Sequence, residues 1–442
     1  MNVLRYSDPD FAGKLAALAK ASSLWDTEIE QRTREIVEAV RLRGDAALLE
    51  YTERFDGARL TPDRLAVTRA ELLAASVHAD ETLRDAVSAA MKNIAAFARR
   101  GLRRNWPSRN AQGARVGEKF DPYHRVGIYS PGGTAPLAST ALMTLTLARV
   151  AGCPEIVVCT PCGRDGSINP ALLFAIRAAG ATEIYRAGGA QAIAAMALGT
   201  ATIPFVQKVF GPGNAYVVAA KRLLFGHVAV DLLPGPSEVL VLADETADAA
   251  WIAADLLAQA EHGSGHERVW LVTPSGRLLK AVGRELAKQL PERARRLEIE
   301  RALANHGWLI QVKTLEQGID LVNRLAPEHC EIHTRAPAKA ALQITTAGAL
   351  FLGRNSPTAL GDYVAGPSHT LPTGGAGASF AGLTVDQFQR RTSIVEYQSA
   401  AVKKSLPLVE TLAGLEGLEA HAWSVRVRVA GGKRKSSRKK QG

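Results

Sequence analysis

The sequence predicts an α/β protein with two doubly wound, incomplete Rossmann-like parallel-sheet domains and small helical N- and C-terminal segments. Strand-like apolar runs alternate with helix-length segments from residue 126 to residue 352, which favours right-handed βαβ units. The alternation divides at Gly235-Pro236-Ser237 into two series, and 442 residues are enough for two large cores. No sequence repeat relates the two series.

The expected elements follow in chain order. The first hundred residues are expected to be helical, mainly over 27–43 and 68–100. In the first series the expected strands are 126–129, 155–160, 183–186, 206–210 and 228–232, with helices over 139–150, 170–179, 190–198 and 215–225. In the second series the expected strands are 238–243, 268–273, 308–312, 329–333 and 350–352. Its expected helices are 277–289 and a run from about residue 247, behind a candidate N-cap at Thr246, to Gly263.

Composition excludes membrane and disulfide-rich secreted proteins. Hydrophobic residues make up 47% of the chain and charged residues 22%, and no charge-free apolar run could span a bilayer. The first twenty residues lack the apolar core of a signal peptide. The four cysteines, at 153, 159, 162 and 330, form no disulfide framework, and the CxxC at 159–162 has no second pair for zinc. We therefore expect buried thiols in a cytoplasmic protein.

The formal charge of +11 is confined to two places. Six positive charges lie in the tail, residues 431–442, and five lie on Arg99, Arg100, Arg103, Arg104 and Arg109, so the remainder is neutral. The tail has the composition of a disordered segment and has no aromatic residue on which a base could stack. We expect a solvated tail and no nucleic-acid partner. A nucleic-acid-binding protein that works through this tail is the alternative from a different class.

A glycine-rich turn in the first series suggests a nucleotide site. Gly211-Pro212-Gly213-Asn214-Ala215-Tyr216 follows an apolar strand and opens a helix, as a phosphate-binding loop does. Asp231 lies where a ribose-binding acid would stand, but Tyr216 takes the place of the third glycine. A strand-to-helix turn without a ligand is the alternative. Tyr129 with Ser130-Pro131-Gly132-Gly133 adds a second such loop, which favours a nucleotide in the crevice.

Residues suited to chemistry gather in the second half of the chain. Gln259 and His262 are three residues apart at the end of an apolar helix, so they share one helix face. A satisfied histidine at a helix C-terminus is the alternative explanation. Glu328 and His329 pair a carboxylate with an imidazole before a strand, and such a pair can exchange protons near neutral pH. The alternative explanation is that Glu328 and His329 are ordinary surface residues, as an isolated Glu-His dipeptide usually is.

The second half of the chain also contains residues that could form a metal site. Asp362 and His369 lie in a long loop rich in glycine and proline, a type that often carries function. Near the end, His421 again follows acidic residues. Gln259, His262, Asp362 and His421 would supply two imidazoles, one carboxylate and one amide, a set that suits zinc with an open position. Their spacings match no known metal signature.

Taken together, these motifs resemble the histidinol dehydrogenase family. The resemblance runs in order over nearly the whole chain, the basic tail excepted, with modest departures at Ser130, Pro234 and Cys330. It is carried by YSPGGTAPLASTALM (129–143), GGAQAIAAMALGT (188–200), GPGNAYV (211–217), GPSEVLVLAD (235–244), LLAQAEHG (256–263), NRLAPEHCEI (323–332), GDYVAGPSHTLPTGGAGASF (361–380), RTSIVEY (391–397) and EGLEAH (416–421).

The resemblance implies an activity and a set of site residues. The activity is the NAD-dependent four-electron oxidation of L-histidinol to L-histidine via L-histidinaldehyde, the last step of histidine biosynthesis, with one Zn²⁺ per subunit. Carried over by motif, the zinc ligands would be Gln259, His262, Asp362 and His421, and the acid/base pair Glu328 and His329. Substrate contacts would be Ser237, Gln259, His262, His329, Asp362, His369, Glu416 and His421, and NAD contacts Tyr129, Gln191 and Asn214.

The resemblance also implies a homodimer with shared active sites. Residues 1–25 would form an N-terminal helical segment, and 26–125 with 238–380 an α/β domain carrying zinc and the catalytic residues. Residues 126–237 would bind NAD, and 381–430 would complete the partner's site. The closer alternative is a related zinc/NAD dehydrogenase of another small hydroxylated substrate, such as a sulfonated diol.

Overall fold

The computed structural model describes residues 1–20, 26–132 and 137–430 and confirms the α/β class. Met1–Gly101 and Tyr123–Phe388 form one compact unit, and Leu102–Pro122 with the chain from Gln389 forms a second. The predicted tail, 431–442, and part of the predicted loop after Tyr129 lie outside the described residues. Among the described helices, none has the length and apolar character needed to cross a membrane.

The second predicted series forms a fully parallel six-stranded sheet in the first unit. Its strands in spatial order are β1 (Asn2–Arg5), β11 (Gly307–Gln311), β10 (Arg268–Thr273), β9 (Glu238–Ala243), β12 (His329–His333) and β13 (Ala349–Leu352). If the strands of the series are numbered 1 to 5 from β9 to β13 along the chain, their order across the sheet is 3-2-1-4-5. This is the order of a doubly wound sheet without its sixth strand. The start of the chain, expected to be helical, instead adds β1 to the edge, with Leu4 fully buried.

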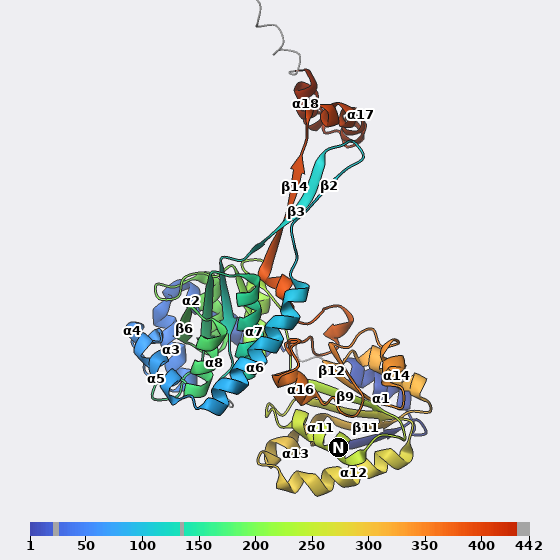
Figure 1. Cartoon of the computed structure of the whole chain (residues 1–442). Coiled ribbons are helices and arrows are strands. Elements are labelled where there is room, and N and C mark those ends of the chain that lie inside the picture. The colour runs from blue at the N-terminus through green and yellow to red at the C-terminus, as the bar shows by residue number, and fades with distance from the viewer. Residues whose placement is uncertain (21–25, 133–136, 431–442) are drawn as a thin grey trace, which may run out of the picture. The chain divides into compact units, whose positions relative to one another are not determined.

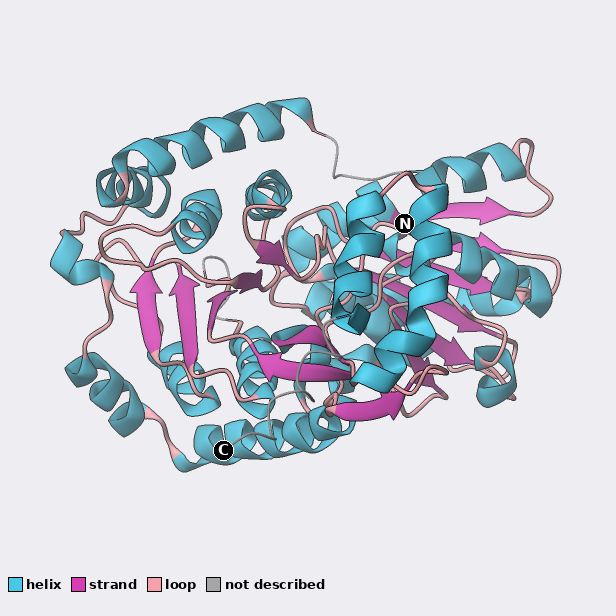
Figure 2. Ribbon diagram, turned by 90° about the horizontal axis from the view of Figure 1, so that it is seen from above, coloured by secondary structure: helices cyan, strands magenta, loops and turns pink. Residues whose placement is uncertain are grey.

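Helices cover both faces of this sheet (Figures 1 and 2). One apolar cluster joins it to α11 (Ala249–Ala260), α12 (Gly276–Gln289) and α13 (Arg296–His306), and the other to α1 (Phe11–Lys20), α14 (Leu315–Leu325) and α15 (Pro337–Ala341). Right-handed crossovers explain the division, because the chain winds one way from β9 to β11 and the other way from β12 to β13. The order of the strands therefore decides which helices face which side.

The first predicted series forms a five-stranded parallel sheet with the same winding. Its strands are β6 (Glu183–Arg186), β5 (Glu155–Thr160), β4 (Arg125–Tyr129), β7 (Lys208–Phe210) and β8 (Ala229–Val230). The connecting helices are α7 (Ala138–Ala151), α8 (Pro170–Ala179), α9 (Gly189–Leu198) and α10 (Ala215–Leu224). Both sheets thus share an arrangement that no sequence repeat predicts.

The helices of the first hundred residues differ from the expectation in two ways. Residues 68–100 form two helices, because Asp80 accepts a hydrogen bond from the Leu83 N–H (2.8 Å) and caps the second one. The elements are α2 (Thr27–Arg43), α3 (Asp45–Asp56), α4 (Pro62–Leu65), α5 (Arg69–His78), α6 (Glu81–Ala98) and η1 (Arg99–Gly101). The predicted domain division groups residues 26–125 with 238–380, but α2 and α3 pack in one apolar cluster with α9 and the five-stranded sheet.

The second unit contains an antiparallel sheet and two helices. Its strands are β2 (Trp106–Arg109), β3 (Arg115–Pro122) and β14 (Gln389–Glu396), and its helices are α17 (Ser399–Leu415) and α18 (Glu419–Ala430). The C-terminal segment, expected to be helical, therefore includes a strand, which pairs with β3 over eight residues. The first unit is completed by α16 (Thr358–Tyr363), η2 (Leu290–Glu292), η3 (Ala376–Ala378) and η4 (Val385–Phe388).

A buried ion pair closes the glycine-rich turn after β7. The side chains of Lys221 and Asp231 pair with no exposed surface. Lys221 Nζ also donates to the Gly211 carbonyl (3.0 Å), and the Gly211 N–H donates to Asp231 Oδ2 (2.8 Å). Gly211 has φ +108°, and a Cβ there would lie 2.1 Å from the Tyr129 carbonyl oxygen, so only glycine fits. The interpretation of Asp231 as a ribose-binding acid is wrong, because its carboxylate is already occupied.

Replacing Lys221 with Met is expected to lower the free energy of unfolding by about 3–5 kcal/mol, because it leaves the Asp231 carboxylate buried without its cation. Urea denaturation followed by circular dichroism measures this change. The matched control is Arg59→Met, which removes an exposed ion pair with Glu53 and is expected to change nothing measurable. Equal, small effects of both substitutions would contradict the structural role given to Lys221.

Candidate active site

Ten of the twelve candidate residues line one cavity of about 1350 Å³ in the first unit. They are Tyr129, Gln191, Asn214, Ser237, Gln259, His262, Glu328, His329, Asp362 and His369. The other two, Glu416 and His421, are exposed residues of the second unit, at the end of α17 and within α18. Residues spread over 240 positions of the sequence are therefore gathered by the fold of one unit.

The two sheets supply opposite ends of their strands to the cavity. Tyr129 is the last residue of β4, and Asn214 caps α10 beyond β7, so the five-stranded sheet contributes carboxyl ends at its switch point. Ser237 directly precedes β9 and His329 is the first residue of β12, so the six-stranded sheet contributes amino ends. Ligands of open α/β sheets usually bind beside the carboxyl ends of the strands. The five-stranded sheet follows this rule, and the six-stranded sheet does not.

Glu238 holds the Glu328–His329 pair in place. Its backbone carbonyl accepts from His329 Nδ1 (2.9 Å), and its N–H donates to Glu328 Oε2 (2.8 Å). The Ser237 hydroxyl donates to the same oxygen (2.6 Å), and His329 Nδ1 lies 3.5 Å from it. Glu328 and His329 are 6% and 3% exposed, so these contacts fix two buried side chains rather than surface groups.

Three imidazoles at the cavity share one hydrogen-bonding pattern. Nδ1 of His262, His329 and His369 lies 3.0, 2.9 and 3.0 Å from the backbone carbonyls of Gln259, Glu238 and Asp362. A carbonyl only accepts, so Nδ1 carries the proton and Nε2 presents a lone pair when the ring is neutral. In His329, Nε2 is buried, lies 3.8 Å from Asp362 Oδ1, and has no hydrogen-bond partner among the described residues. It is placed to accept a proton.

Three of the four predicted zinc ligands line the cavity and carry donor groups that a metal could use. Gln259 is 3% exposed and lines the cavity, where its side-chain carbonyl oxygen Oε1 could serve as a ligand. The bond from His262 Nδ1 to a backbone carbonyl is the usual outer contact of a metal-binding histidine. Asp362 supplies a carboxylate that acts electrostatically on both Glu328 and His369. Two imidazoles, a carboxylate and an amide are donors that suit zinc; the fourth predicted ligand, His421, belongs to the second unit.

Burial controls the protonation of the acidic groups. It raises the pKa of Glu328 to about 8, against the opposing effect of the hydrogen bonds from Ser237 and Glu238. It also raises the pKa of Glu238 to about 7, although Arg268 opposes this shift. Burial lowers the pKa of His369, which keeps that ring neutral, and Thr140 Oγ1 lies 3.3 Å from its Nε2. A carboxyl group with a pKa near 8 can act as acid or base close to neutral pH.

The predicted NAD contacts lie around the ends of β4, β6 and β7. The Tyr129 hydroxyl accepts from the Gly189 N–H (3.2 Å), and burial raises its pKa to about 12, so it stays neutral. Gln191 Oε1 is buried without a hydrogen-bond partner in the residues described. Asn214 Oδ1 accepts from the N–H groups of Tyr216 and Val217 (3.1 Å each) and caps α10. Asn214 therefore shapes the turn in addition to any contact with a ligand.

The first and last residues of α11 differ from the prediction. Asp248, not Thr246, is the N-cap, because its carboxylate accepts from the Ala250 and Trp251 N–H groups. The helix ends at Ala260, so His262 lies in the following turn rather than on the helix. Sequence reasoning also missed Glu238, although a lone acid at the start of a buried apolar strand was a usable signal.

Two doubly wound sheets around a cavity with a buried acid/base pair and a metal-type donor group define an α/β enzyme of the dehydrogenase class. The family model for histidinol dehydrogenase matches residues 19–429. Histidinol dehydrogenases from Synechococcus sp. and Geobacillus kaustophilus are 48% and 46% identical to the chain, covering 90% of it and 92% and 93% of the relatives. The crystal structure of histidinol dehydrogenase from Elizabethkingia anophelis aligns with a TM-score of 0.91 at 35% identity, covering 98% of both chains. The chain belongs to the histidinol dehydrogenase family and is an oxidoreductase.

The free energy of unfolding of the metal-free protein is expected to fall as pH rises from about 5 to 8. The Glu328→Gln variant is expected to show a smaller fall over the same range. The folded state keeps the Glu328 proton up to a pKa of about 8, whereas the unfolded state loses it near 4.5, so rising pH favours unfolding in this window. Because each pKa unit is worth about 1.4 kcal/mol, the difference between the two proteins should reach a few kcal/mol. Thermal unfolding at several pH values measures it. Parallel pH profiles would contradict the raised pKa.

Proposed function

We propose that this chain oxidises L-histidinol to L-histidine through L-histidinaldehyde and reduces two NAD⁺, which is the last step of histidine biosynthesis. The observation that carries the proposal is the buried Glu328–His329 pair, whose unpartnered Nε2 faces Asp362 in the cavity. Membership of the histidinol dehydrogenase family supports the substrate. The comparisons do not favour a dehydrogenase of another hydroxylated substrate such as a sulfonated diol.

Gln259, His262, Asp362 and His421 would hold one Zn²⁺ per subunit. Bound there, zinc would supply a Lewis acid and orient the imidazole and amine of the substrate. Ser237, His329, His369 and Glu416 would contact the same substrate. Tyr129, Gln191 and Asn214 would bind NAD at the carboxyl ends of the five-stranded sheet, which places cofactor and substrate groups in one cavity.

In the first half-reaction, His329 Nε2 takes the proton of the substrate hydroxyl, and the hydride from the same carbon would pass to NAD⁺ held by Tyr129, Gln191 and Asn214. The product is the aldehyde. The tautomer fixed by the Glu238 carbonyl makes Nε2 the base, and the imidazolium that forms lies beside the carboxylates of Glu328 and Asp362. In the second half-reaction, ionised Glu328 takes a proton from water as the water attacks the aldehyde carbon. The hydrate would then lose a hydroxyl proton to solvent and a hydride, which a second bound NAD⁺ would accept, leaving the carboxylic acid.

A homodimer with shared active sites would bring Glu416 and His421 to the partner's cavity. Exposed apolar residues on α17, α18 and the turn between them support association through the second unit: Leu408, Leu412, Leu415, Leu418, Trp423 and Val427. A surface with this many large apolar side chains is typical of an interface. We place the enzyme in the cytoplasm, which the four free cysteines of the described structure support.

The direct test is NADH formation from L-histidinol by the zinc-loaded protein. Two NADH per histidinol are expected, with loss of turnover after chelation and recovery when Zn²⁺ is restored. Absorbance at the NADH band measures both. Removal of residues 431–442 is expected to leave turnover unchanged, which separates this function from a nucleic-acid role for the tail. Turnover of a sulfonated diol but not of histidinol would contradict the proposal.

Substitutions of the acid/base pair should affect the two half-reactions differently. His329→Gln is expected to lower kcat by about 10²- to 10⁴-fold, because it removes the base for the first proton. Glu328→Gln is expected to slow the second half more than the first, so that aldehyde accumulates and can be trapped with a hydrazine. The control is His227→Gln, a histidine outside the cavity. Unchanged kcat in His329→Gln would contradict its role.

A further inference from the structure

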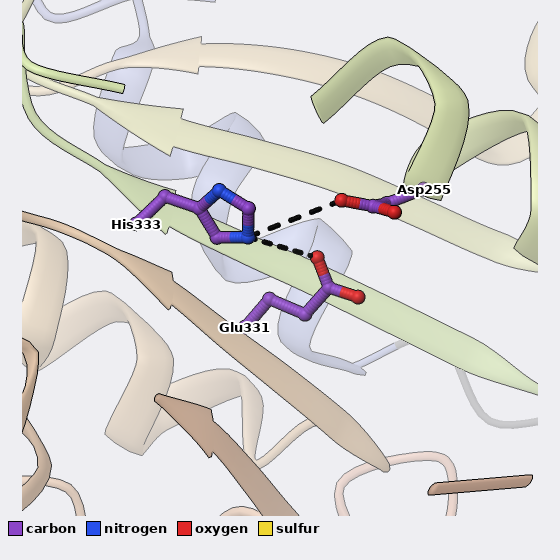
Figure 3. Close-up of side chains that lie close together, drawn as sticks. All are labelled: Asp255, Glu331 and His333. Carbon is purple, nitrogen blue, oxygen red and sulfur yellow. Dashed lines mark ion pairs between the residues drawn. The ribbon is translucent and has the colours of Figure 1, made fainter. Parts of the chain in front are cut away.

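We propose that Asp255, Glu331 and His333 form a second divalent-cation site that takes a transition-metal ion such as Mn²⁺ or Zn²⁺. These three residues are distinct from the predicted zinc ligands Gln259, His262 and Asp362. Figure 3 shows their side chains pointing toward one another, with His333 Nε2 directed at both carboxylates. The inference does not depend on the proposed reaction.

The ligand atoms have the spacing of a metal site. One atom from each residue lies within 4.8 Å of the other two. His333 Nε2 lies 3.2 Å from Glu331 Oε2 and 3.9 Å from Asp255 Oδ2. Two ligands about 2.1 Å from one metal are separated by about 3.0–3.5 Å, so a small rotation of Asp255 would complete the group. One imidazole and two carboxylates suit divalent transition metals.

Two of the three residues are deeply buried and have polar atoms without a hydrogen-bond partner. Glu331 is fully buried and His333 is 3% exposed. Glu331 Oε2 and both ring nitrogens of His333 form no hydrogen bond within residues 1–20, 26–132 and 137–430. Buried polar atoms nearly always have a hydrogen-bond partner, and those that lack one can mark the place of a bound ion. The orphaned atoms thus point to a ligand in addition to the clustering of charges.

Local structure presents the donors to the cluster. Glu331 and His333 are two residues apart on β12, so their side chains lie on the same face of the sheet, and Asp255 comes from α11, which packs on that face. Glu331 Oε1 accepts from the N–H (2.7 Å) and hydroxyl (2.8 Å) of Thr358, which leaves Oε2 for the cluster. Hydrogen bonds that orient a carboxylate in this way are characteristic of metal sites.

The charge of the cluster favours a cation. Neither carboxylate pairs with a lysine or arginine in the part of the chain that the structure describes. Asp255 and Glu331 also line the main cavity, so the cluster lies at its wall.

The experiment uses the full chain with His262→Gln and Asp362→Asn, which removes the predicted zinc ligands of the first unit. After chelation, binding of Mn²⁺ is followed by loss of the free-ion signal in electron paramagnetic resonance. One Mn²⁺ per chain is expected, together with a rise in Tm. Adding His333→Gln, or separately Asp255→Asn, is expected to weaken Mn²⁺ binding at least about tenfold. Adding His227→Gln, the matched control, should leave it unchanged.

Absence of Mn²⁺ binding in the His262→Gln/Asp362→Asn protein would overturn the proposal, as would binding of equal strength after His333→Gln and Asp255→Asn. In either case the triad would be a proton-sharing network that packs α11 on β12. Circular dichroism of each variant establishes that it is folded. Because no histidinol or NAD is used, this result stands apart from the turnover assay, and either hypothesis can fail alone.

Discussion

The pairing of β9 with β12 is the constraint on which the site depends. The register places His329 opposite Val239, so the Glu238 carbonyl meets His329 Nδ1 and the Glu238 N–H meets Glu328. One residue of a neighbouring strand thus selects the tautomer of His329 and orients the Glu328 carboxyl group. A slip of one residue would turn both side chains away, because alternate residues of a strand face opposite sides. The surrounding core holds the register, with Val239 and Val241 fully buried.

The turn into β12 explains how adjacent residues reach one cavity. Ala326 ends α14 with φ +46°, a left-handed conformation that is unusual for alanine, and Pro327 disfavours the right-handed helical region at that position. Such backbone strain persists only where the surrounding structure enforces it, and it gathers at functional sites. Here the strained turn positions Glu328 and His329 at the amino end of their strand, whereas the five-stranded sheet presents the carboxyl ends of its strands to the cavity.

Local patterns predict much of the fold, and with the family resemblance they predict residues that line one cavity, but not the geometry of that cavity. Strands 155–160, 183–186, 238–243, 268–273 and 329–333 match the prediction to the residue, because apolar runs between turn signals are local features. Sequence patterns miss β1 because its pairing with β11 joins residues 306 positions apart. The interpretation of Asp231 is wrong because its partner Lys221 is recognisable only once the helix and strand are packed. The same limit hides Glu331 and His333, which in the sequence simply look like part of a buried strand.

The central claim is that the amino end of the six-stranded sheet holds the metal and the reacting groups. Diffraction from crystals of the zinc-loaded protein, with anomalous data at the zinc edge, tests it most directly. The account predicts an anomalous peak in each cavity, bound by Gln259, His262 and Asp362, with His421 of a second chain as the fourth protein ligand. A cavity in which no zinc is bound by Gln259, His262 and Asp362, in crystals of the active, zinc-loaded protein, would contradict the account.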